Sequence, residues 1–152
     1  MSIEEFFDFP FTFTKRKDFT PCDTRPLWKA SLIILILGVV GRNNSASLQK
    51  IHVANWVVKS AEHLNSILEW QGKEERMRPN VRLEPAIDHV LNFMISNKIL
   101  EKENGSMCLT ELGVEIYQEL DQENVFCDEK RFLLESKKYL SEAAVKRIFE
   151  GV

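Results

Sequence analysis

The stretch KILEKENGSMCLTELG, residues 98–113, decides the fold. At its centre, Asn104-Gly105 is the favoured pair for a two-residue type I′ turn, because both turn positions need a positive φ. Counting outward from the turn gives four cross-strand pairs: Glu103–Ser106, Lys102–Met107, Glu101–Cys108 and Leu100–Leu109. In this register the hairpin has an apolar face with Leu100, Met107 and Leu109, and a polar face with Glu101, Glu103 and Ser106. A slip of one residue would exchange the two faces, so the pattern predicts this register.

Helical patterns flank the hairpin on both sides. Before it, Glu84-Pro85 opens a helix whose apolar residues recur at helical spacing. Its expected buried stripe is Ala86, Ile87, Val90, Leu91, Met94 and Ile95, and its expected outer face is Asp88, His89, Asn92, Ser96 and Asn97. After the hairpin, Thr110 can cap a helix over 111–122, in which Gly113 permits close packing. Helix, tight hairpin and helix in this order make the winged-helix arrangement.

The sequence therefore predicts a mainly α, winged-helix-like domain with one two-stranded β-hairpin as its wing. We expect an extended aromatic-rich arm over 1–24, the winged-helix domain over 25–122, and a C-terminal helical extension of the same domain over 123–152. The step Leu109-Thr110-Glu111-Leu112-Gly113 is similar to the Leu-Thr-x-x-Gly step that often follows a wing. Winged helices serve both as DNA readers and as protein docking modules, so this fold class leaves the function open.

An aliphatic run, Leu32–Val40, predicts the central helix of the domain. Thr24 is its expected N-cap, and Pro26 falls in the first turn, where a missing N–H costs nothing. A membrane span needs ~20 apolar residues, and this run is much shorter, so we expect a buried helix and no membrane contact. Two amphipathic helices over 46–59 and 61–70 and an exposed polar loop over 71–79 should follow.

Six of the ten phenylalanines lie within the first 24 residues. Four of them alternate with other residues in the manner of an extended strand, and are the expected partner-binding residues: Phe7, Phe9, Phe11 and Phe13. Pro10 argues against a central strand. The arm should lie either across its own domain or across a partner, because exposed phenylalanines are costly to leave in water.

Composition argues against an enzyme and against a secreted, disulfide-bonded protein. The chain has 152 residues and three widely spaced cysteines with no Cys-x-x-Cys pair: Cys22, Cys108 and Cys127. This pattern favours reduced thiols and a cytoplasmic location. The three histidines do not fall at metal-ligand spacing, and no phosphate-loop, dinucleotide or nucleophile-elbow motif occurs. We therefore expect no catalytic residue, no metal and no cofactor.

Charge gives little support to autonomous DNA binding. The net charge is −3, whereas a duplex-binding domain usually carries clustered lysine and arginine. The outer face expected for the helix before the hairpin has no arginine to pair with guanine. The candidate nucleic-acid contacts are Arg76, Arg78, Arg82, His89, Asn92, Lys98 and Lys102. Glu101 and Glu103 oppose the wing lysines, so a solvated surface of mixed charge is the alternative.

Several short stretches carry a narrower resemblance, spread between Arg25 and about Phe132. They are Arg25-Pro26-Leu27-Trp28-Lys29, the aliphatic helix, Ala46–His52, Asn55-Trp56 and Leu83–Asp88. Together they resemble the small middle component of bacterial three-component systems built around an ABC or SMC-like ATPase, the Lamassu-type anti-phage defences among them. The resemblance implies a small subunit that bridges the coiled-coil ATPase and an effector, commonly a nuclease. It carries no catalytic motif to transfer.

The leading hypothesis is a non-enzymatic adaptor between such an ATPase and an effector nuclease, with DNA touched mainly through the complex. A stand-alone winged-helix transcriptional regulator is the first alternative. A self-associating structural protein, for which a homodimer would suffice, is the second.

Overall fold

The structure is a computed structural model, and it describes residues 26–150. The expected cap Thr24 and the aromatic arm, with Phe7, Phe9, Phe11 and Phe13, lie outside the described residues. Pro26 is the first residue of the first described helix, α2 (Pro26–Val39). This helix carries the aliphatic run and ends next to Val40, as the sequence predicts.

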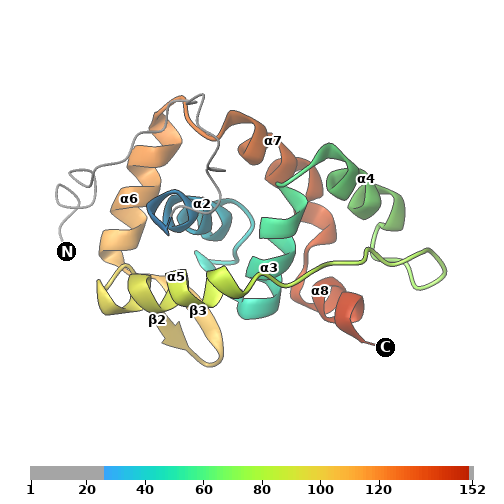
Figure 1. Cartoon of the computed structure of the whole chain (residues 1–152), viewed down its shortest axis with the longest axis horizontal. Coiled ribbons are helices and arrows are strands. Elements are labelled where there is room, and N and C mark those ends of the chain that lie inside the picture. Colours follow the sequence, from blue (N-terminus) through green and yellow to red (C-terminus); the bar gives the residue numbers. More distant parts are fainter. Residues whose placement is uncertain (1–25, 151–152) are drawn as a thin grey trace.

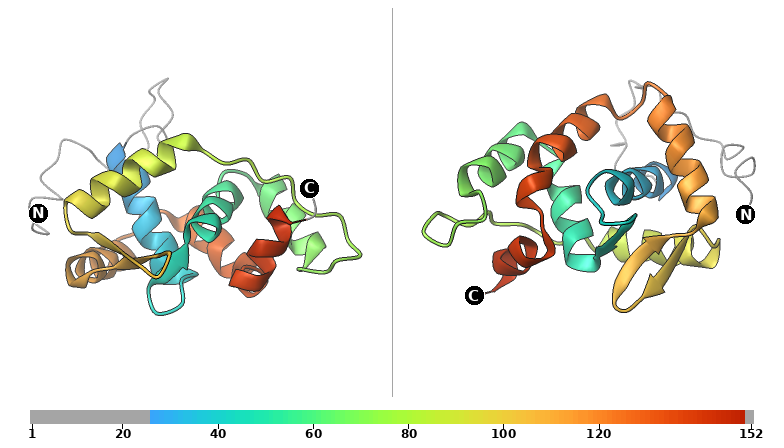
Figure 2. Two further views of the ribbon diagram at one scale, coloured as in Figure 1. Left: turned by 90° about the horizontal axis from the view of Figure 1, so that it is seen from below. Right: turned by 180° about the vertical axis from the view of Figure 1, so that it is seen from behind.

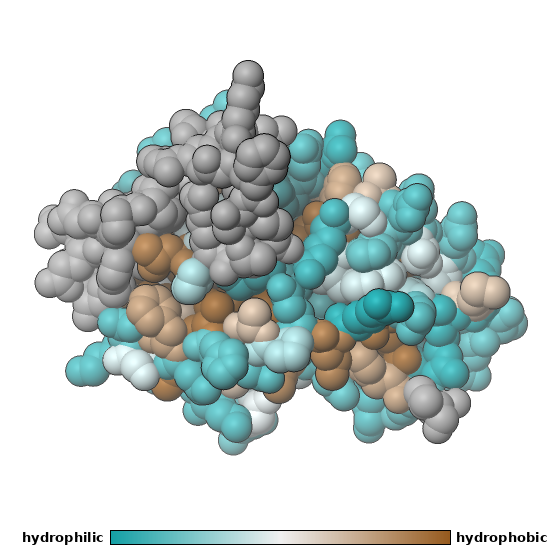
Figure 3. All heavy atoms as spheres, viewed as in Figure 1, coloured by the Kyte–Doolittle hydropathy of each residue, from teal (hydrophilic) through white to brown (hydrophobic). Residues whose placement is uncertain are grey.

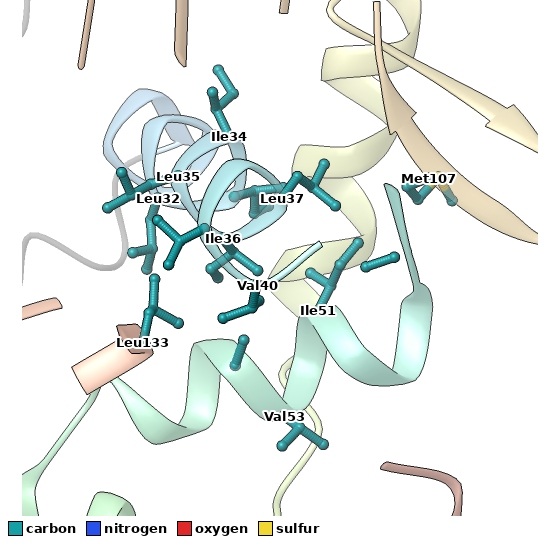
Figure 4. Packing of buried hydrophobic residues seen from close by; sticks show 14 of the residues in the cluster. Leu32, Ile34, Leu35, Ile36, Leu37, Val40, Ile51, Val53, Met107 and Leu133 are labelled. Carbon is teal, nitrogen blue, oxygen red and sulfur yellow. The ribbon is translucent and has the colours of Figure 1, made fainter. Parts of the chain in front are cut away.

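Helix α2 is the centre of the domain (Figure 1). It packs against α3 (Leu48–Val57), α5 (Pro85–Ser96), α6 (Glu111–Gln122) and α7 (Cys127–Ser136). Every residue from 29 to 37 is buried, which confirms the prediction that this helix is apolar on nearly every face. Figure 4 shows its leucines and isoleucines surrounded by side chains of α3, β3 and α7.

The chain is mainly helical and winged-helix-like, as predicted. In addition to the helices above, it forms α4 (Ala61–Trp70), the short 3-10 helix η2 (Lys137–Tyr139) and α8 (Glu142–Phe149). Among residues 26–150, no helix is both long enough and apolar enough to span a bilayer.

The hairpin has the register counted from its turn. Strands β2 (Leu100–Glu103) and β3 (Ser106–Leu109) pair antiparallel, with Glu103 opposite Ser106 and Leu100 opposite Leu109. Asn104 and Gly105 have φ angles of 51° and 80°, as a type I′ turn requires. The apolar face, with Leu100, Met107 and Leu109, is buried, and Glu101 and Glu103 are exposed.

A third strand extends the sheet that the sequence predicts as a two-stranded hairpin. Residues Ser45–Ser47 form β1, which pairs antiparallel with β3 and gives the strand order β1-β3-β2. The sequence prediction placed Ser45 in a helix-ending turn and started the next helix at residue 46. Instead, the helix starts at Leu48, with Ser47 as the N-cap whose side chain accepts from the Lys50 backbone N–H.

Helix α3 is not amphipathic, which corrects the prediction for 46–59. Eight of its ten residues are buried, including the polar His52 and Asn55, whereas Leu48 is 38% exposed. The helix is enclosed because α2, α4, α7 and α8 all pack against it. A helix in such a position is apolar on most sides, and its buried polar groups need hydrogen-bond partners inside the protein.

Helices α5 and α6 flank the hairpin along the chain, as predicted, and pack against it. In α5, Ile87, Val90, Leu91 and Met94 are buried, but Ala86 is exposed and Ile95 only half-buried. Thr110 caps α6: its hydroxyl oxygen accepts from the Gly113 backbone N–H at 3.2 Å. A Cβ at Gly113 would collide with the Ile99 carbonyl oxygen, so glycine is what allows α6 to pack this closely.

The C-terminal helices belong to the same hydrophobic core. Phe126, Leu133, Leu140, Val145 and Ile148 are buried in one cluster with the residues of α2 and α3. Leu134, next to Leu133, is instead 62% exposed. In space, the hairpin lies beside α5 and α6, far from the loop that follows α4. Figures 1 and 2 show this arrangement from three sides.

Candidate functional site

The candidate site is a groove of about 340 Å³ between α3, the start of α5 and α8, which we call the α3–α5–α8 groove. Its lining combines apolar and polar side chains: Leu48, Gln49, His52, Leu83, Glu84, Pro85, Asp88 and Phe149. Leu83 is 58% exposed and Leu48 is 38% exposed, so two exposed leucines lie on the same groove. Hydrophobic side chains also reach the surface in the region of α8 and the segment leading into α5 in Figure 3.

Beneath the groove, a polar network holds the start of α5 in place. One carboxylate oxygen of Glu84, Oε2, accepts from Asn55 Nδ2 at 2.7 Å and from Lys29 Nζ at 3.4 Å. Lys59 Nζ lies 3.1 Å from the same oxygen. Lys29 also donates to Asn55 Oδ1 at 2.9 Å. The network therefore joins α2, the last turn of α3, the segment between α3 and α4, and the residue that precedes α5.

The surroundings of Glu84 favour its ionised form. Burial alone would raise the pKa of Glu84, but the Asn55 hydrogen bond and the charges of Lys29 and Lys59 outweigh it and lower the pKa. Lys29 is only 1% exposed, so its ammonium needs acceptors inside the protein, and Asn55 Oδ1 and Glu84 Oε2 are two of them. A carboxylate whose oxygen already contacts three donors is poorly suited to proton transfer, because its ionised form is held in place. Its geometry instead suits a structural role, fixing Leu83 and Pro85 at the edge of the groove.

His52 forms part of the groove floor in its neutral form. The Glu84 backbone N–H donates to His52 Nδ1 at 3.4 Å, which requires that nitrogen to be unprotonated. Nε2 then carries the proton and lies 3.9 Å from Asp88 Oδ1. Burial lowers the pKa of His52, and the nearby Asp88 and Glu84 carboxylates offset only part of this effect.

This histidine should make the protein less stable in mild acid. The unfolded chain protonates His52 near pH ~6.5, whereas the folded chain resists protonation, so the unfolded state binds more protons below that pH. Stability contributed by neutral His52 is thus present above pH ~6.5 and is lost as the pH falls through the lowered folded-state pKa. We expect the melting temperature of the wild type to fall between pH 7 and 5, and that of His52→Gln to fall less steeply.

The matched control for this experiment is His89→Gln, since His89 is exposed on α5. The melting temperature of His89→Gln should fall with pH as steeply as that of the wild type. Equal slopes in the wild type and in His52→Gln, measured by calorimetry over the same pH range, would contradict the assignment.

The candidate nucleic-acid contacts do not form one surface. His89 and Asn92 are exposed on α5, Lys98 and Lys102 follow near the hairpin, and Arg82 lies in the segment before α5. Arg76 and Arg78 belong to the loop at the opposite end of the molecule from the hairpin (Figures 1 and 2). Arg76 Nη1 donates to the Glu69 carbonyl at 2.9 Å, and Arg78 Nη1 to the Arg147 carbonyl at 3.2 Å.

The wing offers little net positive charge to a phosphate backbone. Lys98 and Lys102 line a hollow of about 670 Å³, and Glu101 and Glu111 line the same hollow. Phosphate contacts depend on unopposed lysine or arginine, because such contacts release counterions from the nucleic acid. Two lysines beside two glutamates at this hollow are a weak basis for duplex binding.

Neither described cysteine is placed as an activated nucleophile. Burial, together with Glu103 and Glu101, raises the pKa of the Cys108 thiol, so the thiol stays protonated at neutral pH. Cys127 is exposed, and its Sγ lies 3.0 Å from Asn124 Oδ1. Within residues 26–150, no three His, Cys, Asp or Glu side chains gather as a metal site would require.

The sequence prediction missed the network beneath the groove. The available signal was a lysine, Lys29, just before the aliphatic run, together with two polar residues, Asn55 and Lys59, on the stripe of the helix predicted over 46–59.

Comparisons of this chain with protein-family models, with curated proteins and with solved structures found no match.

Proposed function

We propose that this chain is a protein-binding adaptor without catalytic chemistry of its own, and that the α3–α5–α8 groove is where a partner docks. The observation that carries the proposal is a pair of exposed leucines at the rim of a groove whose polar residues are held by hydrogen bonds and ion pairs. Leu83 and Leu48 are exposed at the rim, while Glu84, one residue from Leu83, is held by three donors. Exposed apolar residues grouped beside polar ones often mark a site of protein association.

The proposed partners are an SMC- or ABC-type ATPase and an effector nuclease of a bacterial anti-phage assembly. This part of the proposal rests on the resemblance of the stretches 25–29, 46–52, 55–56 and 83–88. Three residues of the network, Lys29, Asn55 and Glu84, fall within these stretches. Six further groove residues do as well: Leu48, Gln49, His52, Leu83, Pro85 and Asp88. The stretches that carry the resemblance are thus the ones that build and support the groove.

The test is to look for such an ATPase and nuclease among the genes that neighbour its own, to co-express the chain with them, and to measure the affinity of the purified chain for each. Full burial of one leucine is worth roughly 1.5–3 kcal/mol, and an aspartate in its place would also have to be desolvated. We therefore expect Leu83→Asp to weaken binding of at least one partner by about 100-fold or more, a loss of ~2.7 kcal/mol.

Leu134→Asp is the matched control, because Leu134 is a leucine of similar exposure that lies on α7 outside the groove. It should bind like the wild type, and both variants should keep the wild-type melting temperature. Unchanged affinity of Leu83→Asp for both partners, or no binding of the wild type to either, would refute the docking groove. Site-specific duplex binding by the isolated chain with a Kd of ~10⁻⁸ M or lower would favour the regulator instead.

A further inference from the structure

A second cavity, of about 410 Å³, lies where the end of α4, the loop that follows it and α8 meet. Its lining consists of Trp70, Gly72, Glu74, Arg78, Arg147 and Glu150, and it shares no residue with the α3–α5–α8 groove. We call it the Trp70–Arg147 pocket. Its size is within the range of ordinary small-ligand sites.

The backbone at the end of α4 shapes this pocket. Gln71 and Gly72 both have positive φ angles, 53° and 74°, and they turn the chain sharply after Trp70. At Gly72 an added Cβ would lie 3.4 Å from Arg147 Nη2, an ordinary van der Waals contact, which places the loop directly beside the guanidinium. Arg78 closes the loop onto α8, since its Nη1 donates to the Arg147 carbonyl at 3.2 Å.

Two residues that line the pocket each carry a buried hydrogen-bond donor that lacks an acceptor. Trp70 Nε1 and Arg147 Nε are both buried, and neither has a hydrogen-bond partner in the part of the chain that is described. Trp70 as a whole is 1% exposed. Buried donors are almost always paired, because leaving one unpaired forfeits its interaction with water. Two such donors in residues that line one cavity indicate that an acceptor from outside residues 26–150 completes the site.

We propose that the Trp70–Arg147 pocket binds the carboxylate of a small ligand or of a peptide end. A carboxylate is planar, has two acceptor oxygens and pairs with guanidinium in a fixed geometry. The indole ring offers a flat apolar wall for the carbon atoms next to it. Glu74 and Glu150 also line the pocket and disfavour a doubly charged anion, so phosphate is the less suitable oxyanion.

The test follows the Trp70 indole Nε1–H resonance by NMR while small ligands are added to the full chain. The probes are sodium acetate, an N-acetylated tripeptide with a free C-terminal carboxylate, the same tripeptide as its C-terminal amide, and inorganic phosphate. We expect a saturable shift with at least one free carboxylate, and binding of the amide and of phosphate weaker by at least tenfold. If acetate binds as tightly as the free-acid peptide, the site is one for small carboxylates. If the free-acid peptide binds much more tightly than acetate, the site is one for peptide ends.

Arg147→Gln should weaken carboxylate binding at least tenfold. Arg131→Gln, the same change at an α7 arginine whose side chain is 61% exposed and does not line the pocket, should leave binding unchanged. Melting temperatures of both variants establish that they are folded, and the Trp70 resonance of the wild type gives a result even where a variant is unstable. The proposal is overturned if no free carboxylate shifts the resonance saturably, or if the amide shifts it equally; bound water alone then satisfies the two donors.

Discussion

Replacing Glu84 by Gln is expected to lower the free energy of unfolding by roughly 3–5 kcal/mol, the usual cost of removing one partner from a buried ion pair. The substitution keeps the shape of the side chain and removes only its charge. The Lys29 ammonium, 1% exposed, then remains buried without the carboxylate at 3.4 Å. Denaturant unfolding measures the loss, and Glu101→Gln on the exposed face of the wing is the control, with an expected change within about 0.5 kcal/mol.

A double-mutant cycle separates the ion pair from the rest of the network. Lys29→Met removes the buried charge, so the double variant Lys29→Met/Glu84→Gln has neither charge to satisfy. Exchange of a buried pair for apolar groups of similar size is often neutral or stabilising. We therefore expect the double variant to be more stable than Glu84→Gln alone. If the two single losses simply add, Lys29 and Glu84 are not energetically coupled and the network does not hold the start of α5 as described.

Truncating Leu35 to Ala is expected to cost 2–5 kcal/mol in denaturant unfolding, the range for deleting a buried leucine side chain. Leu35 is completely buried in the middle of α2, among side chains of the surrounding helices (Figure 4). The identical change at Leu134, which is 62% exposed, should cost less than about 1 kcal/mol. Similar losses at the two positions would mean that α2 is not the centre of the core.

The features that the sequence predicted best are those with short-range causes. The register of β2 and β3 follows from two turn residues that need positive φ and from an alternation that one slipped residue would invert. The burial of α2 follows from an aliphatic composition that leaves no polar face to point at water. The Thr110 cap depends on Gly113 three positions later, and Gly113 meets Ile99 because the predicted hairpin brings the two together.

The strand β1 illustrates what a local pattern cannot reveal. Its three residues, Ser45–Ser47, have no apolar alternation and stand after a turn-forming run, so the sequence predicts the end of one helix and the start of the next. They become a strand because Ala46 pairs with Met107, about sixty positions further along the chain. A pairing of this separation depends on where α2 and α3 place the backbone, and no periodicity within the segment records it.

By itself, then, the sequence determined the mainly helical, winged-helix-like class, the central helix and the hairpin with its register. Only the tertiary structure decided which polar residues meet: Lys29 and Asn55 are 26 positions apart, and Lys29 and Glu84 are 55 apart. It also placed Leu48 and Leu83 on one groove, and Trp70 and Arg147 on one pocket. The physical reason is that turns, caps and amphipathic faces act over a few residues, whereas contacts between distant side chains depend on how the helices cross and where the loops close.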